Sequence, residues 1–132
     1  GYLLRSAENQ KPMDELLFNQ NGRGVFKDVC PLVASLISEQ LSTNNILPED
    51  ISKFWLHQAN GKMIRLIASK VLGRDDFDQS IIPMPIEKYG NLASVGSLVA
   101  FNLNNDLEPG EKGVICSFGA GYSICSLLVE KN

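Results

Sequence analysis

The 132-residue sequence has few of the residues that build metal and disulfide sites. It contains one histidine and three cysteines, and no two cysteines form a Cys-x-x-Cys pair. A single histidine excludes a His-rich metal site, and an odd number of separated cysteines is typical of reduced cytoplasmic proteins. The sequence therefore predicts a cytoplasmic protein with no metal and no other cofactor.

Long apolar runs and an excess of positive charge are also missing. No apolar run reaches the roughly 18 residues that cross a bilayer, and residues 1–10 lack the pattern of a signal peptide. The net charge is −3 and the pI is about 5.1, so a global basic field for nucleic acid is absent, although a local basic patch stays open. We expect neither a membrane span nor a nucleic-acid partner.

The composition fits one globular domain, with 44% apolar and 20% charged residues. The chain begins with Gly1 and no methionine, and residues 1–24 are mostly polar and end in a Gly/Asn-rich run. We expect 1–24 to be a lead-in loop and 25–132 to be the domain, with the chain either cut or preceded by an upstream portion that is missing here.

Hydrophobic periodicity predicts helices that alternate with strands. Helical stripes run over 25–41, 63–72 and 95–103. Extended segments are expected at 54–56 and from 81–82 onward, and residues 113–118 and 122–129 read as a hairpin. The order predicts an α/β fold in which helices pack on a mixed sheet.

Four residues mark the expected ends and irregularities of these elements. Pro31 should kink or delay the first helix, and Gly73 should end the second. Ser94 is a possible N-cap of the third helix. Pro48 is well placed to open a short helical turn.

Polar features follow or interrupt the predicted strands. His57 comes directly after Phe54-Trp55-Leu56, where an imidazole could exchange a proton beyond the end of a strand. Asn91 lies in a Gly-containing turn and could donate to an oxyanion, and Gly119-Ala120-Gly121 could bring backbone N–H groups to a ligand. Each also has a commoner structural role, in a hydrogen bond, a turn or a hairpin. For Asn60, capping the second helix is the favoured interpretation.

The cysteines offer no convincing nucleophile, which would need a lowered thiol pKa. Cys30 lies on the apolar stripe of the first helix and is expected to be inert core. Cys116 and Cys125 fall in the terminal strands, where core or supporting roles are expected.

Three motifs together resemble the β-ketoacyl-acyl-carrier-protein synthase III family of condensing enzymes. They are Trp55-Leu-His-Gln-Ala-Asn60, Tyr89-Gly-Asn-Leu-Ala-Ser94 and Ser117-Phe-Gly-Ala-Gly-Tyr122, in the family's order and approximate spacing. The resemblance runs from about Gly22 to the C-terminus. It departs from the family at Ala120, where glycine is usual, and after Tyr122, where Ser-Ile-Cys replaces Thr-Trp-Gly.

This resemblance implies the C-terminal half of a thiolase-like fold and a set of site residues. His57 and Asn91 match the catalytic histidine and asparagine, and the Ala120 N–H matches an oxyanion-hole donor within the loop of Gly119 and Gly121. Further matches place Asn60 near the pantetheine arm and Lys62 near the tunnel mouth. Basic residues that could meet CoA or carrier protein follow on the same helix, where a solvated face is an equal alternative: Arg65 and Lys70.

The activity implied by the resemblance is decarboxylative condensation of malonyl-thioester with an acyl primer in fatty acid or related biosynthesis. Acyl-CoA and malonyl-acyl-carrier-protein would be the substrates. The nucleophilic cysteine would come from the missing N-terminal half, and the complete enzyme would be a homodimer. An isolated half should be inactive and expose a large apolar face. The alternatives are an acyltransferase or secondary-metabolite enzyme on the same scaffold, or a non-catalytic partner subunit.

Overall fold

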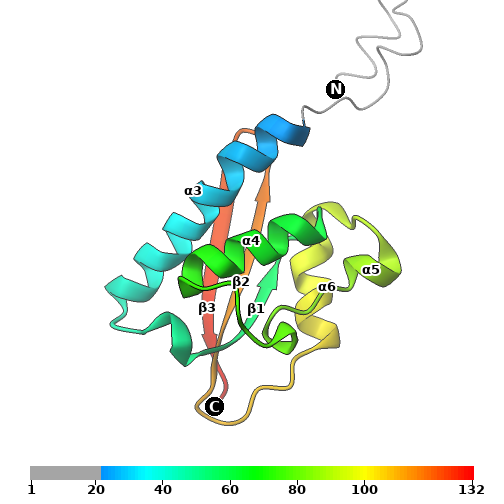
Figure 1. Cartoon of the computed structure of the whole chain (residues 1–132). Helices are drawn as coiled ribbons and strands as arrows, with labels where there is room; N and C mark the ends of the chain where they lie inside the picture. The colour runs from blue at the N-terminus through cyan, green and yellow to red at the C-terminus, as the bar shows by residue number, and fades with distance from the viewer. Residues whose placement is uncertain (1–21) are drawn as a thin grey trace, which may run out of the picture.

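The computed structural model describes residues 22–132, which form a mixed three-stranded sheet with helices on both faces (Figure 1). The central strand, β2 (Lys112–Gly119), runs parallel to β1 (Ile51–Leu56) and antiparallel to β3 (Ser123–Glu130). The α/β class, the mixed sheet and the terminal hairpin predicted from periodicity are confirmed.

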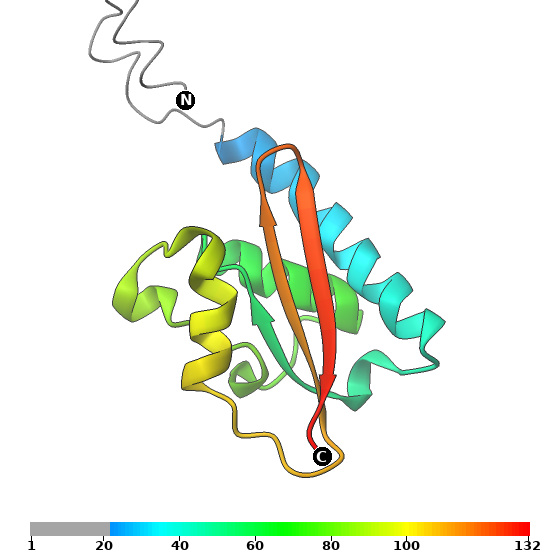
Figure 2. The ribbon, with the colours of Figure 1, turned by 180° about the vertical axis from the view of Figure 1, so that it is seen from behind.

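Two helices, α3 (Gly22–Thr43) and α4 (Gly61–Leu72), cover one face of the sheet, and α6 (Gly96–Leu103) lies against the other (Figures 1 and 2). Because side chains alternate along a strand, Phe54 and Leu56 enter the larger core beneath α3 and α4, whereas Trp55 enters a smaller core beside α6. None of the described helices has the length and apolarity that a bilayer crossing needs.

The predicted helix boundaries are largely correct. Pro48 opens a 3₁₀ turn, Pro48–Asp50, and Gly73 ends α4 in the left-handed conformation with φ 67°. The first helix differs, because α3 starts at Gly22 and continues through the exposed Pro31. The expected loop at 22–24 and the late helix start are therefore wrong, and the rest of the expected lead-in loop lies outside the described residues.

The extended stretch predicted from 81–82 onward is also wrong. The segment forms a 3₁₀ turn, Gln79–Ile81, and the four-residue helix α5, Ile86–Tyr89. Pro83 has no N–H for a ladder, and the carbonyl of Pro83 and the N–H of Ile86 bond instead to the Gln58 side chain. A buried side chain thus replaces the neighbouring strand that the apolar pattern suggested.

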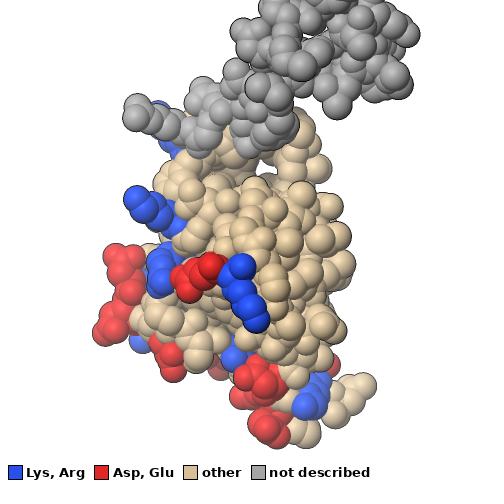
Figure 3. Space-filling model, turned by 90° about the vertical axis from the view of Figure 1, so that its right-hand side faces the viewer, with Lys and Arg blue, Asp and Glu red and all other residues tan. Residues whose placement is uncertain are grey.

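The third helix exposes the apolar stripe that its periodicity placed in the core. Val95, Leu98 and Leu103 are each about half exposed, at 51%, 55% and 51%. The small residues Gly96, Ser97 and Ala100 face the sheet instead, which lets α6 approach it closely. Ser94 lies in a 3₁₀ turn, Ala93–Val95, and is not the N-cap of α6. Figure 3 faces this side of the molecule, where broad uncharged areas surround a few acidic and basic side chains near the middle of the view.

Gly113 of β2 is expected to tolerate no side chain. A Cβ there would lie 2.2 Å from Cζ3 and 2.6 Å from Cη2 of the buried Trp55 ring. Overpacking of this kind costs about 1–3 kcal/mol, so Gly113→Ala should lower the free energy of unfolding by that amount in urea titration. Gly119→Ala in the same strand is the control, because its Cβ would meet only Ser123 Oγ at 3.7 Å. Equal stability of the two variants would contradict the prediction.

Candidate active site

One cavity of about 660 Å³ brings together residues from all three sequence motifs. His57 follows β1, Asn60 precedes α4 and Asn91 lies after α5. Gly119 ends β2, and Ala120 follows it. The cavity therefore lies beyond the carboxyl ends of the two parallel strands, where α/β sheets place their ligand sites. The structure thus gathers the predicted imidazole, amide and Gly-rich loop around one space.

His57 is held by contacts on two sides. Its Nδ1 lies 3.3 Å from Ser117 Oγ, and its ring is tilted by 51° against Phe118, with centroids 4.5 Å apart. The residue is buried, and burial lowers the pKa of the imidazole below its ordinary value because the charged form loses solvation. The resting ring is therefore mainly neutral near pH 7.

The side chain of Asn91 is oriented by the turn that contains it. Its Oδ1 accepts a hydrogen bond from the Ala93 N–H at 2.8 Å, which leaves the Nδ2 hydrogens to donate elsewhere. Ala93 has a positive φ of 50°, an uncommon conformation for a residue with a Cβ. Strained backbone of this kind is found at functional sites. Asn91 can thus present an amide donor at the cavity.

Asn60 combines a structural role with a place in the cavity. Its Oδ1 accepts a hydrogen bond from the Lys62 N–H at 2.8 Å, so the predicted N-cap of α4 is confirmed. The basic side chains predicted near the tunnel mouth lie exposed on α4 and do not line this cavity. Among the described residues, none of them forms an ion pair: Lys62, Arg65 and Lys70.

The Gly-rich loop has a backbone that suits its residues. Gly121 has φ 131°, which favours glycine, whereas Ala120 is not among the residues with positive φ, so its Cβ is tolerated. Alanine can therefore occupy position 120, where the family usually has glycine, without backbone strain.

The three cysteines lie away from the cavity lining. Cys30 is buried, and burial raises the pKa of its thiol against a smaller opposing effect of the Lys70 charge. Burial also raises the pKa of Cys116 to about 12. The core position predicted for Cys30 is confirmed, and of the core or supporting role expected for Cys116 the core alternative holds. Cys125 is exposed on β3, so the core alternative is wrong for it. No described cysteine is placed as a nucleophile of this site.

Gln58 and Ser117 are functional candidates that sequence reasoning missed. Gln58 is fully buried, and its Nε2 donates to the carbonyls of Leu56 and Pro83 at 2.8 and 3.3 Å, while its Oε1 accepts from the Ile86 N–H at 3.1 Å. Gln58 directly follows His57, and Ser117 lies two residues before Gly119, so both residues are inside the motifs. Their roles are visible only from hydrogen-bond partners that are distant in sequence.

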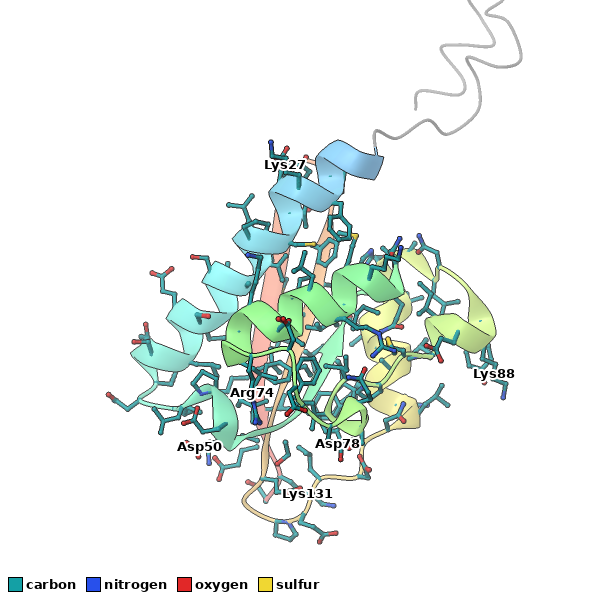
Figure 4. The ribbon with its side chains drawn as sticks, viewed as in Figure 1. Lys27, Asp50, Arg74, Asp78, Lys88 and Lys131 are labelled. Carbon is teal, nitrogen blue, oxygen red and sulfur yellow. The ribbon has the colours of Figure 1, made fainter. Side chains whose placement is uncertain are left out.

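The cavity lining has no permanently charged side chain among the described residues. None of its described lining residues carries a carboxylate, an ammonium or a guanidinium group. Within residues 22–132, no three His, Cys, Asp or Glu side chains group as a metal site requires. None of the charged residues labelled in Figure 4 lines the cavity: Lys27, Asp50, Arg74, Asp78, Lys88 and Lys131. The arrangement suits neutral hydrogen-bond donors acting on a polarised substrate.

The family model of the 3-oxoacyl-[acyl-carrier-protein] synthase III C terminal matches residues 41–131, which contain the three motifs. The chain belongs to this family. It is 46% identical to a beta-ketodecanoyl-[acyl-carrier-protein] synthase of Pseudomonas aeruginosa, over all of this chain and 38% of that protein. It is 33% identical to a beta-ketoacyl-[acyl-carrier-protein] synthase III of Chlorobium phaeovibrioides, over 93% of this chain and 37% of that protein.

A solved structure of a beta-ketoacyl-[acyl-carrier-protein] synthase III from Thermus thermophilus shares the fold of this synthase III C-terminal chain. The TM-score is 0.75 at 26% identity, over 86% of this chain and 35% of that one. The thiolase-like half expected from the motifs is therefore confirmed. The chain spans less than two fifths of the length of each of these relatives.

Proposed function

We propose that this chain provides the C-terminal catalytic part of a 3-oxoacyl-[acyl-carrier-protein] synthase III-type condensing enzyme. The observation that carries the proposal is the shared cavity of His57, Asn91 and Ala120. The named relatives support it, since both are synthases that act on acyl carrier protein substrates by name. The reaction would serve fatty acid or related biosynthesis in the cytoplasm.

The chemistry that the site supports best is stabilisation of a thioester enolate. Loss of carbon dioxide from a malonyl-thioester leaves negative charge on the thioester carbonyl oxygen. His57 and the Asn91 amide would donate hydrogen bonds to that oxygen as the charge develops. The enolate carbon would then attack an acyl thioester, whose own oxyanion the Ala120 N–H would hold. A neutral amide suits Asn91, because a carboxylate there would repel the enolate.

The acyl group would be carried on a thiol supplied by polypeptide other than these described residues. Support comes from the raised thiol pKa of the two buried cysteines and from the absence of any described cysteine in the cavity lining. The exposed apolar side of α6 offers a surface for the part that carries this thiol, which we place in the N-terminal half of the enzyme. The complete enzyme would be a homodimer, as the family resemblance implies.

Substrate delivery would use the outer side of α4. Asn60 lies at the cavity beside the start of this helix, near the expected path of a pantetheine arm. The exposed cations Lys62, Arg65 and Lys70 follow along α4 and would attract the phosphates of CoA or an acidic carrier protein.

Incubation with a short acyl-CoA tests where the nucleophile lies. Intact-mass spectrometry of this chain should find no acyl adduct, whereas iodoacetamide should add once, at the exposed Cys125. The alkylation shows that an accessible thiol is detected, and Cys125→Ala should abolish it as the matched control. A stoichiometric acyl adduct on Cys30, Cys116 or Cys125 would mean that this chain has its own active thiol, and the assignment of the nucleophile would be wrong.

A further inference from the structure

Ser117 connects the imidazole of His57 to a backbone carbonyl. Its Oγ lies 3.3 Å from His57 Nδ1 and donates to the Ser94 carbonyl oxygen at 3.3 Å. A hydroxyl has one hydrogen, and a carbonyl can only accept. With that hydrogen directed at Ser94, the Ser117 oxygen faces the ring as an acceptor, so Nδ1 carries the proton. In the neutral ring, Nε2 then holds an unshared electron pair.

We propose that Ser117 is a positioning residue that fixes the tautomer of His57, so that the neutral imidazole presents Nε2 to the cavity as a hydrogen-bond acceptor. The catalytic consequence of this tautomer rests on the condensing function proposed above. The hydrogen-bond chain itself runs through three elements: the end of β1, the strand β2 and the 3₁₀ turn Ala93–Val95.

The sheet register explains why Ser117 meets His57. In the parallel pair, Leu56 lies opposite Cys116, and the next residues along the two strands are His57 and Ser117. The contact therefore depends on the same ladder that forms the central sheet. The ring is also held on another side by Phe118, at 4.5 Å between centroids. None of the described residues lining the cavity has a carboxylate that could compete for the Nδ1 proton.

The fixed tautomer changes how His57 would act on a substrate. A neutral ring with its proton on Nδ1 cannot donate from Nε2, so donation to an oxyanion requires that Nε2 first take up a proton from solvent. A malonyl carboxylate in the cavity favours this, because a nearby negative charge stabilises the imidazolium. Nδ1–H bonds to Ser117 in both charge states, so the ring can gain the proton without turning.

The single histidine of the sequence makes the tautomer directly measurable. Long-range ¹H–¹⁵N correlation spectra of the chain with ¹⁵N-labelled histidine, recorded above the imidazole pKa, should show a protonated Nδ1 and an unprotonated Nε2. Ser117→Ala should shift the population toward the Nε2–H tautomer, and Ser117→Thr, which keeps the hydroxyl, should retain the original pattern. Ser126→Ala is the control, because Ser126, on the neighbouring strand β3, loses its hydrogen bond to Gln40 of α3 and does not contact His57.

Each outcome decides the proposal. A wild-type ring with its proton on Nε2 overturns it without any variant, and so does an unchanged tautomer in Ser117→Ala. The single Trp55 indole, which donates to the Asn104 carbonyl at 3.1 Å, reports in the same samples whether each variant is folded. The spectra do not depend on activity. If the chain proved not to take part in condensation, the tautomer result would be unaffected. If the tautomer proposal failed, the proposed condensation would be unaffected.

Discussion

Replacing His57 by alanine in the active enzyme is expected to slow malonyl-thioester decarboxylation by a factor of about 10²–10³, the typical loss for one oxyanion donor. The imidazole lies in the cavity with Asn91 and Ala120, and removing it leaves the developing enolate with one fewer donor. Acylation of the thiol should be largely spared, because the Ala120 N–H, the donor proposed for the oxyanion of an acyl thioester, stays in place. The two steps can be followed separately, by carbon dioxide release from malonyl-thioester and by mass spectrometry of the acyl-enzyme.

The matched variant is His57→Gln, whose side-chain amide keeps an N–H donor at the same position. Glutamine should retain more decarboxylation than alanine if donation to the enolate is the role of this residue. The assignment fails if alanine slows acylation and decarboxylation to the same extent. That result would mean that His57 acts on the thiol or supports the fold, and its contact with Phe118 would then be the first place to look for a packing defect.

The fold was predictable where local pattern and tertiary packing agree. The strand at 54–56, the helix ended by Gly73 and the terminal hairpin each carry a signal within a few residues, and each is present in the structure. The prediction failed at 81–95, because two prolines and a buried glutamine partner set that backbone. It also failed for the outward face of α6, because periodicity reports an apolar stripe but not the surface that covers it.

The main residues of the candidate site were also predictable from the sequence, but their supporting contacts were not. His57, Asn91 and the Gly-rich loop were selected by motif, and the structure brings them to one cavity. Ser117 stands 60 residues from His57 in sequence, and their contact follows from the strand register. No periodicity or motif fixes that register in advance. The supporting contacts of the site therefore became visible only in the structure, whereas the residues proposed to be catalytic could be selected from the sequence.

Gln58→Leu is expected to destabilise the domain by about 3 kcal/mol or more. Leucine has a comparable size but leaves the Leu56 and Pro83 carbonyls and the Ile86 N–H without their partner. Each buried polar group left unpaired costs about 1–3 kcal/mol. Urea unfolding of both proteins measures the difference in the free energy of unfolding.

Gln79→Leu provides the control for this substitution. Gln79 is exposed and donates one hydrogen bond of 3.4 Å to the Phe77 carbonyl, so its loss should change stability by no more than about 0.5 kcal/mol. If Gln58→Leu costs as little as Gln79→Leu, the three bonds do not hold the segment. If it costs the expected amount, Gln58 links β1, which ends just before His57, to the segment that leads to Asn91. Gln58 would then hold the two proposed catalytic residues, His57 and Asn91, at the same cavity.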